Sequence, residues 1–146
     1  RTEFINNEKS SKYSYFHDID PNFMKDTRYT CIELFKHKKW KNNTDFKNTI
    51  KELKTVFGEN IGQAFFSIMK GSKFIAPHKD NDSKVNYRRY HYSIIVHKND
   101  NAYLKVKNKK HYWKENDFFY FDPKEMHSVF KPKTYKRVLL IVDVLF

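Results

Sequence analysis

The sequence is poor in several residue types, and each shortage excludes a class of protein. Its 146 residues include one cysteine, Cys31, so the chain can form neither an internal disulfide nor a cysteine-ligated metal cluster. This favours a reducing, cytoplasmic compartment, although the first residue is Arg1 rather than Met, which leaves open whether a signal or anchor preceded it. No apolar run reaches the roughly 18 residues that a transmembrane helix needs. Without linkers or low-complexity blocks, residues 1–146 are expected to form a single domain.

Acidic residues are also scarce relative to basic ones. The chain has 29 Lys and Arg against 17 Asp and Glu, a formal charge of +12. Such an excess can indicate a polyanionic partner. Here the cations are mostly lysine and are spread along the chain, which is also rich in Asn, Ile, Phe and Tyr. A general drift in amino-acid composition therefore explains the excess of basic residues. We therefore do not expect a nucleic-acid partner, although the charge can attract an acidic substrate.

The first part of the chain carries few regular signals. Residues 1–12 are polar and lack periodicity, which predicts a loose N-terminal arm. Asp20–Pro21 predicts a turn, and residues 29–35 resemble a strand. Thr44–Asp45 offers a helix N-cap, and Gly58 offers the stop. Four apolar residues between them recur at helical spacing and predict the core-facing side of the helix: Phe46, Ile50, Leu53 and Phe57.

From residue 61 onward the pattern changes to about seven short strands separated by turn signals. They are expected at residues 63–69, 74–78, 90–97, 102–107, 117–121, 127–130 and 137–145. The turn at residues 99–101 predicts that the strands on either side of it pair with each other. This pattern after one helix predicts a mainly-β chain folded as an antiparallel sandwich or jelly roll.

Two histidines and an aspartate form a candidate metal site. His78 and Asp80 lie at the exit of a predicted strand, two residues apart, and side chains with this spacing on an extended chain project to the same side. His127 follows a later strand and supplies a second imidazole. Two histidines and one carboxylate make up the facial triad of non-haem Fe(II) oxygenases. An alternative for Asp80 is capping the loop or orienting His78 from outside the coordination sphere.

Arg137 is also unusual, because this charged residue is the first residue of a long apolar strand. A guanidinium that enters a core needs an anion. A dicarboxylate co-substrate held by the guanidinium fork would supply one. The alternative is a structural ion pair with a core acid such as Asp143.

These residues lie within a wider resemblance. From Phe65 to Phe146 the sequence resembles the aspartyl/asparaginyl β-hydroxylase family of Fe(II)/2-oxoglutarate-dependent oxygenases. The matching pieces occur in the family's order, and together they are specific although each alone is weak. They are Phe66-Ser67, Gly71, Pro77-His78, Arg89-Tyr90-His91, Trp113-Lys-Glu, Phe121-Asp122, His127-Ser-Val and Arg137-Val-Leu-Leu-Ile-Val-Asp143-Val.

The resemblance implies a double-stranded β-helix, with one or two N-terminal helices packed on it, and a role for each matching residue. His78 and His127 would bind Fe(II), Arg137 and Ser67 the distal carboxylate of 2-oxoglutarate, and Arg89 and His91 its other end. Arg88 replaces Arg89 if the register slips by one residue. Trp113 is expected in the core.

Asp80 is where the chain departs from the family. The animal peptide hydroxylases have a glycine at this position and manage with two histidines, whereas Asp80 would add a third ligand. Related bacterial hydroxylases of free amino acids, such as proline hydroxylases, carry His-x-Asp. The identity of the substrate therefore depends on this part of the site.

The sequence thus predicts an Fe(II)/2-oxoglutarate-dependent dioxygenase. With O₂ it would hydroxylate an unactivated carbon of an amino acid, or of an Asp/Asn-type residue in a peptide or protein. One alternative is a non-catalytic jelly-roll domain whose basic surface holds an acidic partner. Another is a cupin-type metal enzyme that does not use 2-oxoglutarate and would have no need of Arg137.

Overall fold

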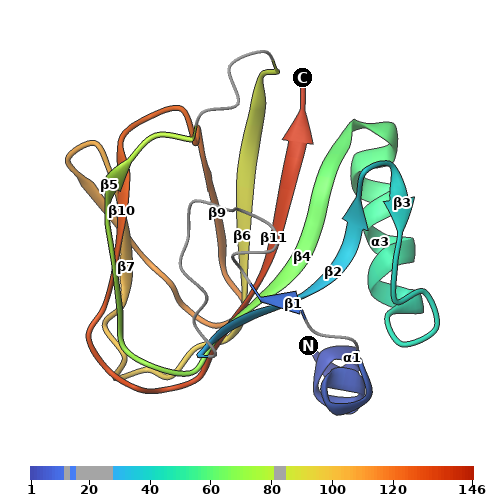
Figure 1. Ribbon diagram of the computed structural model, residues 1–146, viewed down its shortest axis with the longest axis horizontal. Coiled ribbons are helices and arrows are strands. Elements are labelled where there is room, and N and C mark those ends of the chain that lie inside the picture. Colours follow the sequence, from blue (N-terminus) through green and yellow to red (C-terminus); the bar gives the residue numbers. More distant parts are fainter. Residues whose placement is uncertain (12–13, 16–27, 81–84) are drawn as a thin grey trace.

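Two antiparallel β-sheets face each other and form a jelly roll (Figure 1). The computed structural model describes residues 1–11, 14–15, 28–80 and 85–146. The larger sheet contains β1 (Ser14–Tyr15), β2 (Tyr29–Lys36), β3 (Lys39–Trp40), β4 (Ile61–Met69), β6 (Tyr87–Ile95), β9 (Phe118–Phe121) and β11 (Arg137–Leu145). The smaller sheet contains β5 (Lys73–His78), β7 (Tyr103–Val106), β8 (Lys109–Tyr112) and β10 (His127–Lys131). The mainly-β jelly roll predicted from the sequence is therefore confirmed.

Strand β11 lies at the centre of the larger sheet and is buried on both faces. It pairs with β4 along one edge and with β6 along the other. Val138, Leu140 and Val142 face the helical side, whereas Leu139 and Ile141 face the smaller sheet. Burial on both faces explains why this strand is an almost continuous apolar run rather than an alternating one.

Helices cover the outer face of the larger sheet. Helix α3 (Lys47–Phe57) lies beside β2 and β4 (Figure 1), and buries Ile50 and Leu53 against them, as its periodicity predicted. Gly58 ends the helix with a φ of 57°, a conformation that favours glycine. The 3-10 turn η2 (Gly58–Asn60) then leads into β4. None of the described helices is both long and apolar enough to cross a membrane.

The predicted cap of α3 is wrong. Neither Thr44 nor Asp45 is its N-cap, which falls on Phe46 without a side-chain hydrogen bond. Instead the carboxylate of Glu3 accepts hydrogen bonds from the backbone N–H groups of Asn48 and Thr49, at 3.0 and 2.9 Å. The free N–H groups of a helix start are thus satisfied by a residue far away in the sequence, which local patterns do not show.

The N-terminal segment is not the loose arm that its composition predicted. Residues Thr2–Asn7 form helix α1, followed by the 3-10 turn η1 (Glu8–Ser10). Phe4 is only 1% exposed and packs on the rings of Phe46 and Phe66. The segment is fixed by this aromatic contact together with the carboxylate contacts of Glu3, and such isolated contacts leave no periodic signal in the sequence. The predicted turn at Asp20–Pro21 lies outside the described residues.

The pairing predicted across residues 99–101 is also wrong. Strand β6 pairs with β11 and β9 in the larger sheet, whereas β7 pairs with β10 and β8 in the smaller one. Asn101 adopts a φ of 54°, and the connection carries the chain from one sheet to the other. Such crossings close a jelly roll and bring distant residues together between the sheets.

Candidate metal centre

Strand pairing brings the two predicted histidine ligands together. His78 ends β5 and His127 begins β10, and the two are direct partners across this antiparallel pair. Side chains of directly opposed residues lie on the same face, and the ring centroids are 4.2 Å apart. The smaller sheet therefore positions two imidazoles from distant parts of the sequence side by side.

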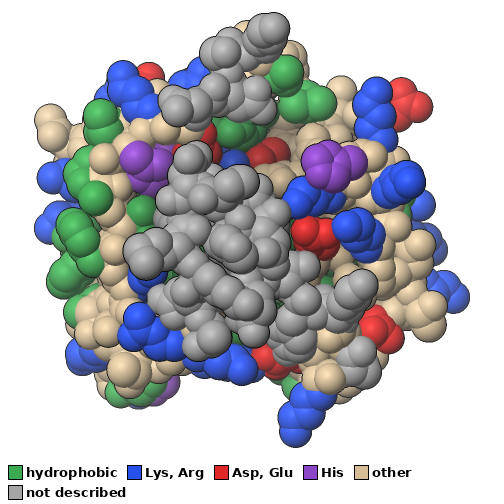
Figure 2. Space-filling view, in the orientation of Figure 1, with side chains coloured by type: hydrophobic (Ala, Val, Ile, Leu, Met, Phe, Trp, Pro, Cys, Tyr) green, Lys and Arg blue, Asp and Glu red, His purple; other side chains and the backbone are tan. Residues whose placement is uncertain are grey.

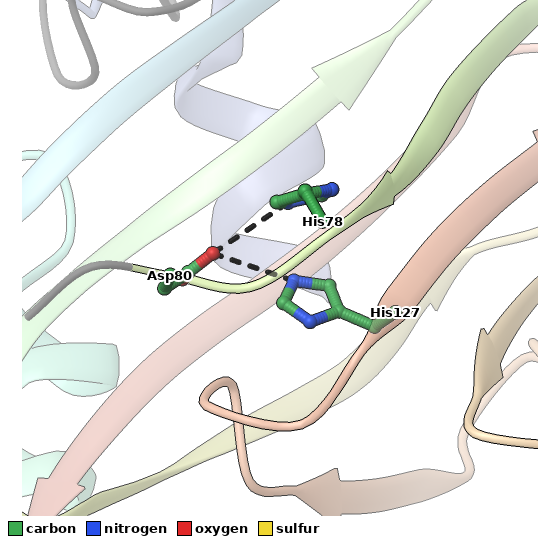
Figure 3. A group of neighbouring side chains, drawn as sticks. All are labelled: His78, Asp80 and His127. Carbon is green, nitrogen blue, oxygen red and sulfur yellow. Dashed lines mark ion pairs between the residues drawn. The ribbon is translucent and has the colours of Figure 1, made fainter.

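Asp80 completes the group (Figure 3). It lies just past β5, where its backbone N–H donates to the carbonyl of Pro123 at 3.0 Å. Its Oδ1 lies 3.5 Å from Nε2 of His78 and 3.4 Å from Nε2 of His127. One ligand atom from each of the three residues lies within 4.8 Å of the others. The three predicted ligands thus converge as the His-x-Asp spacing predicted.

Backbone carbonyls orient both rings. Nδ1 of His78 lies 2.9 Å from the carbonyl of Ala76, and Nδ1 of His127 lies 2.7 Å from that of Glu125. A carbonyl can only accept, so each Nδ1 carries the proton and each Nε2 is left as the metal-binding nitrogen. Two neutral imidazoles and one carboxylate are a donor set that fits Fe(II).

Asp80 is held in its ionised form. Burial acts to raise its pKa, but the neighbouring His127, the guanidinium of Arg89 and the neighbouring His78 outweigh burial and lower the pKa to about 2. The side chain of His127 is 5% exposed and that of His78 is 33% exposed. The site is therefore closed on the His127 side and accessible beside His78.

Arg89 lies beside the metal site, but its guanidinium is already engaged by the chain. Nε and Nη2 donate to the two carboxylate oxygens of Asp143 at 2.8 and 3.0 Å, and Nη1 donates to Oδ2 of Asp80 at 2.8 Å. Gln63 also donates to Asp143, at 3.0 Å. This differs from the expected arrangement, in which Arg89 is offered to a co-substrate. Arg88 does not take its place, because it pairs with Asp122 at 3.2 Å.

Arg137 has the opposite environment. It is 2% exposed, and among the described residues its Nε and Nη1 have no hydrogen-bond partner. Its guanidinium lies 4.2 Å from the ring of Trp113, a cation–π contact. Burial lowers the pKa of Arg137, against opposing effects of Tyr29 and Asp100. The alternative ion pair with Asp143 is not formed, since Asp143 is bound to Arg89.

His91 presents a second unpartnered donor. Trp113 donates from Nε1 to Nδ1 of His91 at 3.2 Å, so the ring proton of a neutral imidazole lies on Nε2. Burial and the charges of Arg89 and Arg137 keep the pKa of His91 well below its usual value, which makes it neutral. Its Nε2 is buried, with no partner among the described residues. Trp113, expected only in the core, thus contacts two of the four predicted co-substrate residues, His91 and Arg137.

Ser67 lies close to this region. It is fully buried on β4 and donates to the hydroxyl of Tyr29 at 3.3 Å. The charge of Arg137 acts on Tyr29, lowering a pKa that burial raises. The sequence pattern did not single out Tyr29. Its position at the start of a predicted strand gave no sign that its hydroxyl is buried.

The chain thus has a cupin-like fold, with a candidate metal site made of His78, Asp80 and His127 beside its smaller sheet. Many solved structures share the fold, among them the following three. An oxidoreductase of the 2OG-Fe(II) oxygenase family from Burkholderia pseudomallei is 10% identical with a TM-score of 0.61, over 88% of this chain and 75% of that one. A DMSP lyase from Ruegeria pomeroyi is 9% identical (TM-score 0.60, 97% and 59% covered). A predicted oxalate decarboxylase from Thermotoga maritima is 13% identical (TM-score 0.52, 81% of each chain covered).

Such low identities show the fold alone, and the family comes from the sequence. The model of the aspartyl/asparaginyl β-hydroxylase family matches residues 1–145, so the chain belongs to this family. The resemblance identified over residues 65–146 is confirmed and extends through the N-terminal part. A search of curated protein sequences found no match.

Proposed function

We propose that this protein is an Fe(II)- and 2-oxoglutarate-dependent hydroxylase. Membership of the aspartyl/asparaginyl β-hydroxylase family supports a hydroxylase, and the dependence on iron and 2-oxoglutarate is the finer part of the proposal. The observation that carries it is the environment of Arg137, a buried guanidinium whose Nε and Nη1 lack partners among the described residues. Burying an unpaired charge is costly, and the described residues supply no partner, so we infer that a bound anion completes this site.

His78, Asp80 and His127 would hold the iron through their converging ligand atoms. Bound there, Fe(II) would supply the activation of O₂ that hydroxylation of an unactivated carbon requires. The chain itself fixes the two rings through the carbonyls of Ala76 and Glu125, so that both Nε2 atoms face the same point. Such pre-orientation is the protein's part in metal-dependent chemistry.

The distal carboxylate of 2-oxoglutarate would bind the guanidinium of Arg137, with the hydroxyl of Ser67 as a further contact. A buried ion pair, Lys131 with Asp100, lies near enough to influence Arg137. Because Asp100 offsets Lys131, one positive charge remains for one carboxylate. His91 would donate from Nε2 to the end of the co-substrate nearer the metal.

Aromatic rings line the route between the two ends of this site. Phe121 packs on His127 with ring centroids 5.2 Å apart, and on His91 at 5.3 Å. Trp113 continues from His91 to Arg137. These rings keep water away from the charged groups, which strengthens each electrostatic contact. They would also hold a short dicarboxylate in one orientation.

We propose as substrate an amino acid, or an Asp/Asn-type residue of a peptide or protein. The non-catalytic alternative would need a surface suited to an acidic partner. On the face shown in Figure 2, Lys and Arg side chains are scattered around the molecule rather than gathered in one stripe, which gives that alternative no support. The other alternative, a cupin-type metal enzyme that does not use 2-oxoglutarate, would not explain the buried Arg137, whose Nε and Nη1 lack partners among the described residues.

Spectroscopy and product formation test this proposal together. Anaerobic addition of Fe(II) and 2-oxoglutarate should produce a weak visible absorption band, and air should then yield succinate. A screen of amino acids and of Asp- or Asn-containing peptides for faster succinate formation would identify the substrate class. His127→Ala should abolish band and succinate, whereas Arg88→Gln, one residue from Arg89, should retain both. Absence of the band in the unmodified protein, together with unchanged 2-oxoglutarate binding in His127→Ala, would overturn the proposal.

A further inference from the structure

The two carboxylate oxygens of Asp80 face different partners. Oδ1 lies 3.5 and 3.4 Å from the Nε2 atoms of His78 and His127. Oδ2 accepts a hydrogen bond from Nη1 of Arg89 at 2.8 Å, and one from the hydroxyl of Tyr87 at 3.5 Å. One oxygen is therefore turned toward the histidines while the other is held on the opposite side. A carboxylate held in this way offers a metal one oxygen rather than two.

Asp80 needs such a restraint because of its place in the chain. It follows the end of β5, beyond the last paired residue, His78, and its backbone N–H is held by the carbonyl of Pro123. Arg89, in contrast, lies in β6 directly opposite Asp143 in the central strand β11. Sites built on strands are held more firmly than sites on connections. The guanidinium of Arg89, held by the larger sheet, therefore fixes the position of Asp80, which lies outside that sheet.

The contacts of Arg89 engage all three of its side-chain nitrogen atoms with carboxylates of the chain. Asp143 takes Nε and Nη2, and Asp80 takes Nη1. All three side chains are largely buried, at 18%, 8% and 20% exposure for Arg89, Asp143 and Asp80. A co-substrate carboxylate arriving here would meet two negative charges at close range, and like charges in a poorly solvated site repel strongly.

We propose that Arg89 and Asp143 are positioning residues that orient Asp80 as a one-oxygen metal ligand, and that Arg89 does not bind the co-substrate. This inference rests on the metal site of the proposed function. The proposed role differs from the co-substrate binding that the family resemblance implies for Arg89. The role of Arg89 differs because this chain has Asp80, whose carboxylate accepts a hydrogen bond from the Arg89 guanidinium.

Cobalt(II) binding to the metal-free protein tests the proposal without any turnover. Calorimetry or the visible d–d absorption of Co(II) gives the dissociation constant. Removing a group that orients a ligand weakens metal binding by about 10- to 100-fold, so Arg89→Gln should do so. Arg88→Gln is the matched control, because it removes a cation from the neighbouring position on β6, where Arg88 pairs with Asp122, and it should bind Co(II) normally.

A double-mutant cycle separates positioning from a general structural effect. In an Asp80→Ala background, Arg89→Gln should cause no further loss of Co(II) affinity, because the residue that it orients is gone. If Arg89→Gln alone does not fold, the pair Arg89→Gln with Asp143→Asn removes both charges together and keeps an amide for Gln63. Equal losses of affinity in both backgrounds would show a structural role and overturn the proposal.

The affinity of the cobalt-loaded protein for 2-oxoglutarate provides the second readout. It should change less than threefold in Arg89→Gln. A large loss of 2-oxoglutarate affinity with normal Co(II) binding would instead make Arg89 a co-substrate ligand. If the unmodified protein binds no Co(II), the metal site of the proposed function fails. If it binds Co(II) and Arg89→Gln binds equally well, only the positioning role fails.

Discussion

Two arginines of the larger sheet, Arg89 and Arg137, have opposite surroundings. Arg89 donates three hydrogen bonds to carboxylates of the chain. Burial acts to lower its pKa, but Asp143 and Asp80 outweigh this effect and raise it. Arg137 is more deeply buried, has two nitrogen atoms without a partner among the described residues, and has its pKa lowered by burial. A guanidinium that the fold satisfies is a structural element, whereas one that the fold leaves unsatisfied marks a ligand site.

Their positions along the sheet separate the two roles. Arg137 begins β11, and Arg89 lies opposite Asp143 near the other end of that strand. At about 3.3 Å of rise per residue, the backbone positions of Arg137 and Asp143 are about 20 Å apart. In our proposal, the arginine at one end of β11 anchors the co-substrate, and the arginine opposite the other end orients the metal ligand Asp80.

The largest expected effect comes from removing the unsatisfied arginine. Arg137→Met should weaken 2-oxoglutarate binding to the cobalt-loaded protein by about 1,000-fold, about 4 kcal/mol, because a buried charge pair loses one member. Calorimetry measures the change, and Co(II) binding itself should not change. Affinity within threefold of the unmodified protein would show that the anion binds elsewhere.

The free energy of unfolding should depend more on Arg89 than on Arg137, which is the reverse of their effects on 2-oxoglutarate binding. Arg89→Met leaves Asp143 and Asp80 without their cation and should lower the free energy of unfolding by about 3 kcal/mol. Arg137→Met removes an unpaired charge and should leave that free energy unchanged, or raise it by about 1 kcal/mol. Urea unfolding of the metal-free variants measures both. A larger loss in Arg137→Met than in Arg89→Met would mean that the contrast between the two arginines is wrong.

The difference between the two arginines also shows which parts of the site could be predicted from the sequence. His-x-Asp spacing, the later histidine and a cation before an apolar strand were local signals. The two histidines and Asp80 lie together, and Arg137 is buried at the start of β11. The pairing of Asp143 with Arg89 depends on the register between β11 and β6, which no local pattern contains. Trp113 likewise joins His91 to Arg137 only after the sheets close on each other. Hydrophobic periodicity shows which face is buried, but not which buried groups meet.

Ligand binding should stabilise only the protein that keeps the unsatisfied arginine. At a 2-oxoglutarate concentration of about 100 times the dissociation constant, linkage predicts a gain of about 2.7 kcal/mol in the free energy of unfolding. Urea unfolding with Co(II), with and without 2-oxoglutarate, measures the gain. Arg137→Met at the same ligand concentration should show almost none. Equal stabilisation of both proteins would indicate nonspecific binding.

The smallest expected effect concerns the serine near Arg137. Ser67→Ala should weaken 2-oxoglutarate binding by about fivefold, about 1 kcal/mol, because one neutral hydrogen bond to the carboxylate is lost while the charge pair stays. Ser93 is the matched control. Both serines are buried, and they flank Leu139 on opposite edges of β11. Calorimetry on Ser93→Ala should therefore give unmodified affinity. Equal losses in the two variants would mean that the hydroxyl of Ser67 only supports packing and that Arg137 alone fixes the carboxylate.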